Sequence, residues 1–166
     1  MPYRARRTRL IIWITALGFL LTSCGFHLRS QVEIPYRSLY VDGTAPVAAV
    51  LRQLIPWGGH PEKLATSSAT AERTIQILEE NKQMIILAIN GAGLVSEYQL
   101  QDEIKYCLLD QQQKQVLAPL KLTLTRDMAY NPNEPYAYGS EEDFLYRDME
   151  TDAARQILYR IAMLDK

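Results

Sequence analysis

The stretch SEYQLQDEIKY, residues 96–106, places its apolar side chains two residues apart. One parity carries Tyr98, Leu100, Ile104 and Tyr106, and the other carries Gln, Glu and Lys. A period of two is typical of a β-strand with one buried and one solvated face. The stretch therefore predicts one strand of an antiparallel sheet that packs on a core with one face.

Two flanking segments show the same period and complete a three-strand meander. The earlier one shows it in Ile75, Ile77, Ile85, Leu87 and Ile89, ahead of an Asn-Gly turn. The later one shows it in Leu120, Leu122 and Leu124. The shared parity pairs Ile104 with Leu122 and Tyr106 with Leu120. It therefore places Lys105 directly opposite Lys121 on the polar face.

Helical spacing replaces this period on both sides of the meander. A short strand over 38–41 precedes a helix with Thr44 as N-cap and a stop at Pro56. Ser140, followed by acids, predicts the N-cap of a last helix whose apolar stripe runs to near the C-terminus. The order β-α-β-β-β-α predicts an α+β fold. We expect a two-layer sandwich with two helices on one face of a four-stranded mixed sheet, which buries every apolar stripe.

The N-terminus has the pattern of an export signal that ends at a cysteine. Residues 1–9 carry four arginines and no acid, and the apolar run that follows has 12 residues. A membrane-spanning helix needs roughly 20. Leu21-Thr22-Ser23-Cys24 resembles the lipobox of bacterial lipoprotein precursors, which implies a covalent N-acyl and S-diacylglycerol lipid on Cys24.

This resemblance divides the chain into three parts. We expect 1–23 to be a cleaved signal peptide, 24–37 a lipidated tether, and 38–166 a single domain. The alternative is an ordinary buried or disulfide-bonded Cys24, for which Cys107 is the only possible partner in the sequence.

Charge and residue types argue against several classes of function. Four of the 18 Lys and Arg residues and none of the 19 acids lie in the signal, so the remaining domain is mildly acidic and we expect no nucleic-acid partner. His27 and His60 have no ligand or nucleophile nearby, and no GxSxG, phosphate-loop, CxxC or HExxH motif occurs. We expect no enzyme, no metal, and no cofactor besides the lipid on Cys24. Unless it pairs with a cysteine of another chain, Cys107 is expected to be buried and inert.

The segments CGFHLR, residues 24–29, and SEYQL, residues 96–100, resemble the LPS-assembly lipoprotein family (LptE, formerly rare lipoprotein B). The resemblance continues at YNPN, residues 130–133, and through the last helix. It implies an outer-membrane lipoprotein that plugs a large β-barrel partner, an LptD-like protein, assists its assembly, and helps deliver lipopolysaccharide to the cell surface. The basic residues through which such proteins are thought to contact lipid phosphates have no counterpart here, because 90–93 and 134–138 contain no cation.

The resemblance also implies a location. Gly25 is not Asp, so the inner-membrane retention rule of such lipoproteins does not apply, and we expect the periplasmic leaflet of the outer membrane. The alternative function is a free-standing periplasmic lipid-binding or carrier lipoprotein, which would need an internal apolar pocket.

Two places are candidate contacts for the partner or lipopolysaccharide. Lys105 and Lys121 would hold an anion between them, unless Glu103, their neighbour on the same face, neutralises them. Tyr136 and Tyr138 lie in an expected loop, Tyr130–Ser140, where exposed tyrosines favour a protein interface. The alternative is a turn whose rings pack on its own domain.

Overall fold

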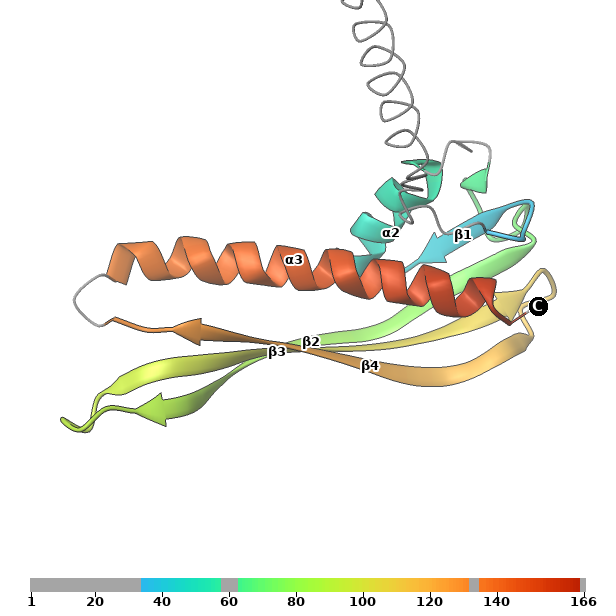
Figure 1. Ribbon diagram of the computed structural model, residues 1–166. Coiled ribbons are helices and arrows are strands. Elements are labelled where there is room, and N and C mark those ends of the chain that lie inside the picture. Colours follow the sequence, from blue (N-terminus) through green and yellow to red (C-terminus); the bar gives the residue numbers. More distant parts are fainter. Residues whose placement is uncertain (1–33, 58–62, 132–134, 165–166) are drawn as a thin grey trace, which may run out of the picture. The chain divides into compact units, whose positions relative to one another are not determined.

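The computed structural model describes residues 34–57, 63–131 and 135–164, all of which lie in one compact unit, Val32–Lys166. Figure 1 shows a long sheet with both helices on one side of it. The elements follow in the order β1 (Leu39–Asp42), α2 (Pro46–Trp57), β2 (Arg73–Ile89), β3 (Val95–Asp110), β4 (Gln115–Ala129) and α3 (Pro135–Ala162). The expected α+β sandwich is confirmed.

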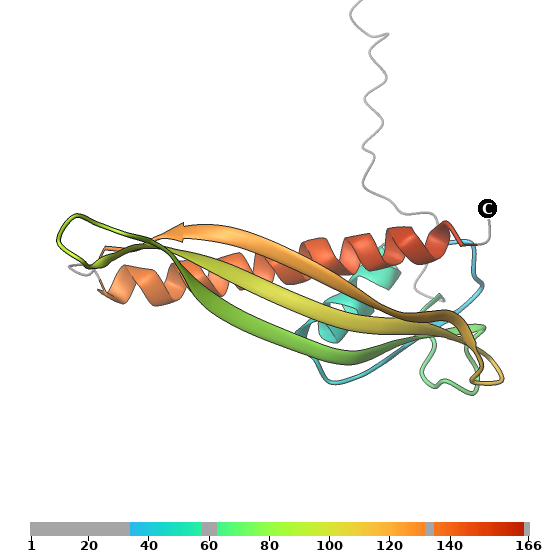
Figure 2. The same cartoon turned by 90° about the horizontal axis from the view of Figure 1, so that it is seen from below.

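The sheet is mixed and its strands lie in chain order, β1-β2-β3-β4. β1 runs parallel to β2, where it pairs with Arg73–Gln76, and Leu39 also forms an isolated bridge with Leu64. The three long strands are antiparallel and form the twisted ribbon seen from below in Figure 2. The predicted register is confirmed, with Lys105 opposite Lys121.

The core lies between the two helices and the face of the sheet that they cover. α2 buries Val47, Leu51 and Ile55, and α3 buries a stripe formed by Met149, Ala153, Ile157 and Ile161. These residues pack in one cluster with the inward-facing side chains of the strands. Within the described residues, no helix is both long and apolar enough to span a membrane.

The packed part of the chain begins before the first strand. Ile34 and Tyr36 are buried in the core. The Tyr36 hydroxyl donates a hydrogen bond to the Ile161 carbonyl at 3.0 Å, and the Arg73 guanidinium lies 5.2 Å from the centre of the Tyr36 ring. This contact joins the start of the domain to the end of α3.

Two predicted helix boundaries were wrong. α3 begins at Pro135, so Ser140 lies inside the helix instead of capping it, and the expected loop is shorter. The extra turn carries Tyr138, whose ring packs on the sheet, so a tertiary contact accounts for the earlier start. α2 runs through Pro56 to Trp57. Pro56 lacks the N–H that would donate to the carbonyl of Arg52, and the helix ends one residue later.

Candidate functional site

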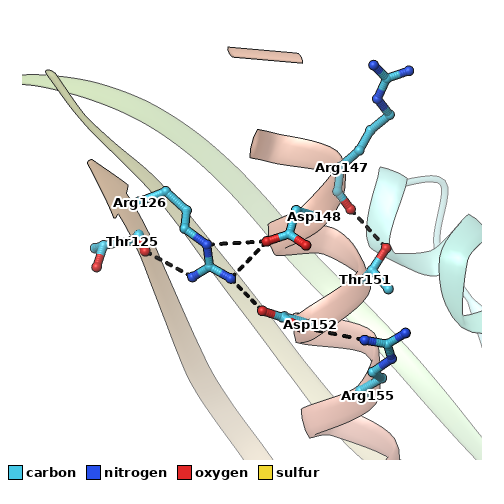
Figure 3. A network of polar contacts seen from close by, with 7 residues as sticks. All are labelled: Thr125, Arg126, Arg147, Asp148, Thr151, Asp152 and Arg155. Carbon is cyan, nitrogen blue, oxygen red and sulfur yellow. Dashed lines mark hydrogen bonds and ion pairs between the residues drawn. The ribbon is translucent and has the colours of Figure 1, made fainter. Parts of the chain in front are cut away.

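α3 is fixed to the sheet by an ionic contact on β4. Figure 3 shows the Arg126 guanidinium between two carboxylates one helical turn apart. Its Nη2 lies 3.0 Å from Asp148 Oδ2 and 2.5 Å from Asp152 Oδ2. The hydrogen bond to Asp148, and then the one to Asp152, raise the pKa of Arg126. This contact holds the helix in one position over β4.

A carboxylate is buried on the core-facing side of β3. Asp102 is 0% exposed, and neither of its carboxylate oxygens has a hydrogen-bond partner among the described residues. Burial first, and then the nearby charge of Glu80, raise the pKa of Asp102 to about 6. Asp102 has the parity of Leu100 and Ile104, so the period of two already placed it on this face, although the sequence analysis did not single it out.

Lys82 of β2 joins this buried region to both helices. Its Nζ lies 2.5 Å from Glu150 Oε1 on α3 and 3.8 Å from Glu80 Oε1. Glu80 Oε2 in turn accepts a hydrogen bond from the Val47 amide at the start of α2, at 3.0 Å. Burial raises the pKa of Glu80. Among the described residues, no group of His, Cys, Asp or Glu side chains is arranged to hold a metal ion.

Two cavities border α3, and charged residues line both. One, of about 470 Å³, is lined by Lys82, Met84, Glu142, Asp143, Tyr146, Arg147 and Glu150. The other, of about 390 Å³, is lined by Val50, Gln53, Leu54, Arg147, Glu150 and Thr151. Arg147 and Glu150 contribute to each, so neither is the wholly apolar pocket that a lipid carrier would need.

The outer face of the sheet is polar where the lysine pair lies. Lys121 Nζ is bonded to Glu103 Oε1 at 2.8 Å, and Glu79 is the β2 residue in register with Lys105. The hydrogen bond from Lys121 lowers the pKa of Glu103. Carboxylates therefore flank both lysines. A role for Lys105 and Lys121 in holding a partner or lipid anion stays a prediction.

Three tyrosines form a cluster near the turn of the β2–β3 hairpin, where Tyr98 is in register with Ile86. The ring centres of Tyr98, Tyr130 and Tyr138 lie 4.9–5.9 Å apart. The Tyr138 hydroxyl donates to Met84 Sδ at 2.7 Å, and burial raises the pKa of Tyr138 to about 12. Tyr130 and Tyr138 thus pack on their own domain, as the alternative held. The side chain of Tyr136, like Cys24, lies outside the described residues, and barrel contact by Tyr136 and Tyr138 stays a prediction.

The far end of the β2–β3 hairpin is exposed and apolar. The sequence analysis expected the helices to bury this stripe, and that expectation was wrong. Between Gln83 and Ser96 the chain has no charged residue, and we call this segment the hairpin end. Its large apolar side chains are 38–61% exposed: Met84, Ile85, Ile86, Leu87, Ile89 and Leu94.

Cys107 matches its expectation in part. Its side chain is buried, it forms no disulfide, and burial raises its pKa. A buried thiol with a raised pKa is a poor nucleophile, so Cys107 offers no reactive site.

Comparison with known proteins assigns the chain. The family model for lipopolysaccharide assembly, LptE, matches residues 35–161. The LPS-assembly lipoprotein LptE of Pectobacterium atrosepticum is 24% identical over 164 residues, which cover 96% of this chain and 88% of that protein. Lipoprotein B of Nitrosomonas europaea has a solution structure that is 28% identical, with a TM-score of 0.69, and covers 83% of this chain and 90% of its own. The crystal structure of rare lipoprotein B from Shewanella oneidensis shares the fold, with a TM-score of 0.64 at 19% identity, over 77% of this chain and 94% of its own.

The fold and these relatives first define a class, that of envelope lipoproteins with a small α+β sandwich domain. The family model spans most of the chain. The chain therefore belongs to the lipopolysaccharide-assembly family, LptE, and is an LPS-assembly lipoprotein.

Proposed function

We propose that this lipoprotein plugs a large outer-membrane β-barrel of the LptD type, assists its assembly, and so helps deliver lipopolysaccharide to the cell surface. The observation that carries the proposal is the polar outer face of the sheet. Gln99, Gln101 and Glu103 occupy every second position of β3 on that face. Gln99 donates a hydrogen bond to Asp127, and Glu103 accepts hydrogen bonds from Gln101 and Lys121. The lumen of a large barrel is polar and hydrated, so this face suits it.

The ionic contacts that hold α3 on the sheet support a structural role. Arg126 holds α3 to β4, and Lys82 holds β2 to α3. A plug must keep its shape against a surrounding wall, and it needs no catalytic step. A free-standing carrier is the weaker candidate, because Arg147 and Glu150 line both of the cavities that border α3.

The proposed anchor is a lipid on Cys24, in the periplasmic leaflet of the outer membrane. Buried acyl carbons contribute about 0.8 kcal/mol per CH₂, and a single chain gives only marginal residence. A diacylglyceryl group together with an N-acyl chain would hold the protein stably beside its barrel.

One experiment tests the barrel and the anchor together. The full-length chain is expressed in its host with a C-terminal tag, extracted in detergent and purified, and the mass of each component is measured. We expect a large barrel protein in the eluate and a chain that begins at Cys24 and carries three acyl groups. An eluate without a barrel would reject the plug, and an unlipidated Cys24 would reject the anchor.

A pair of variants shows whether the outer face makes the contact. Gln101→Leu combined with Thr123→Leu makes that face more apolar and should reduce the recovered barrel. Arg155→Leu, on the exposed side of α3, is the matched control and should leave it unchanged. Equal losses of recovered barrel in both variants would show that the polar face does not make the contact.

A further inference from the structure

Half of the exposed large apolar side chains among the described residues lie in the hairpin end, Gln83–Ser96. Ile86, Leu87 and Ile89 are exposed, and Met84 Sδ accepts a hydrogen bond from the Tyr138 hydroxyl. Contiguous exposed apolar surface of this kind marks an interaction site in a natural protein.

The edge of β2 is open along the same segment. β1 covers only Arg73–Gln76, because it ends at Asp42 and the chain turns away at Gly43. Gly43 has φ of 125°, and a Cβ added there would lie 3.1 Å from Ile77 Cβ, so the turn requires glycine. Beyond Gln76, no other described strand pairs with this edge. Its outward N–H and C=O groups are therefore available to another strand.

The opposite edge of the sheet is protected by a proline, which β2 lacks. β4 contains Pro119 at a register shift, and Lys121, Arg126 and Asp127 follow it. Proline, bulges and charges are the usual means by which edge strands avoid pairing. β2 has bulges at Leu78 and Leu87, so regular pairing is limited to Glu79–Ile86. Beyond that run, residues 87–96 of the hairpin end offer side chains alone.

The chemistry of the segment selects its occupant. Acyl chains would cover the apolar side chains but would leave the backbone groups of the edge without partners, which is costly in hydrocarbon. A charged peptide would find no opposite charge between Gln83 and Ser96. An extended, uncharged protein segment satisfies both the backbone and the side chains.

We propose that an extended, uncharged segment of the barrel partner adds to the open edge of β2 and packs on the hairpin end. This inference rests on the proposed plug function and specifies one of its contacts. The partner segment pairs with the regular part of β2 up to Ile86, and its side chains cover Leu87, Ile89 and Leu94.

Hydrogen exchange followed by mass spectrometry tests the pairing. The full-length lipoprotein is compared alone in detergent, in detergent with purified lipopolysaccharide, and in its purified complex with the barrel. We expect the amides of 79–86 on the open edge to exchange at least tenfold more slowly in the complex only, while those of 115–118 on β4 stay unchanged. Protection by lipopolysaccharide alone would assign the hairpin end to lipid and overturn the proposal.

Matched charge substitutions supply a second readout. Ile85 and Val116 are each 42% exposed and lie on β2 and β4 respectively. Ile85→Lys should weaken recovery of the barrel about tenfold, because a charge would be buried without a partner. Val116→Lys should leave recovery unchanged.

The outcomes separate this inference from the proposed function. If wild type recovers no barrel, the plug function fails. If wild type recovers the barrel but residues 79–86 gain no protection, or both lysine variants recover it equally, the strand pairing fails and the plug function stands.

Discussion

The two halves of β2 contain similar residues in different surroundings. In the first half, Ile75 is 0% exposed and Ile77 is nearly as buried. In the second half, Ile85, Ile86 and Ile89 are exposed. The first half has β1 on its edge and α2 over its face, whereas the second half has neither. Isoleucine in a strand therefore shows only that a strand forms, and the neighbouring elements decide whether it is buried.

The exposed half remains a strand because its backbone is paired on the other side. β3 is in register with β2 from Arg73 opposite Asp110 to Ile89 opposite Val95. These hydrogen bonds need no covering helix, and β-branched residues favour the extended backbone on either surface. Folding of the domain thus rests on the first half, which leaves the second half free for a partner.

Truncation of one isoleucine in each half should give the largest contrast. Ile75→Ala removes buried methyl groups and leaves a cavity, and it should lower the free energy of unfolding by about 2–5 kcal/mol. Ile85→Ala should change it by less than about 0.5 kcal/mol. Equilibrium unfolding in urea measures both, with the slope of the transition as a check on two-state behaviour. Similar losses in the two variants would show that the second half is covered in solution.

Most of the fold followed from periodicity and breakers in the sequence. The strand order and the register of Ile104 with Leu122 needed only side-chain parity, which a single buried face enforces. Parity could not predict which half of β2 is covered by other elements, because this depends on where α2 ends and on how short β1 is. The early start of α3 likewise depends on Tyr138 reaching Tyr98, a contact between distant parts of the chain.

The candidate site was harder to predict than the fold. Parity identified the lysine pair and its carboxylate neighbour, because such pairs follow from register alone. Parity also placed Asp102 inward, but its burial without a bonding partner appears only once Glu80 and Glu150 are packed around it. The lipid attachment at Cys24 is a covalent modification, for which the sequence pattern is the evidence.

The boundary between the two halves can be probed through Asp102, which is in register with Lys82. Its pKa is about 6 in the folded protein, against 3.8 for an unperturbed group. The folded state therefore holds this proton more tightly than the unfolded chain. The contribution of Asp102 to the free energy of unfolding is therefore constant below about pH 3.8, falls as the pH rises from 3.8 toward 6, and stays low above pH 6. A shift of this size corresponds to a loss of up to about 3 kcal/mol at neutral pH.

Asp102→Asn should remove this pH dependence. We expect the variant to be more stable than wild type by about 1–3 kcal/mol at pH 7 and to match it near pH 4. Glu103→Gln is the matched control on the adjacent, outward-facing position, and it should show no gain at pH 7. Thermal or urea unfolding at several pH values measures these differences. A variant that is less stable than wild type both at pH 7 and near pH 4 would show that the Asp102 carboxylate has a hydrogen-bond partner in solution.

The smallest expected effect concerns the outer face at the same boundary, where Lys105 lies opposite both Glu79 and Lys121. Like charges in opposite positions destabilise a sheet by a few tenths of a kcal/mol, and the Glu103 carboxylate at 2.8 Å from Lys121 offsets that repulsion. Lys105→Gln with Lys121→Gln should therefore change the free energy of unfolding by only a few tenths of a kcal/mol, and recovery of the barrel and binding of lipopolysaccharide should scarcely change.

If an anion of the barrel or of the lipid sits between the ammonium groups, the double variant should instead bind more weakly, and the loss should shrink as salt rises. Binding measured at low and high salt distinguishes the two. A salt-dependent loss would show that Lys105 and Lys121 themselves hold an anion of the barrel or of the lipid.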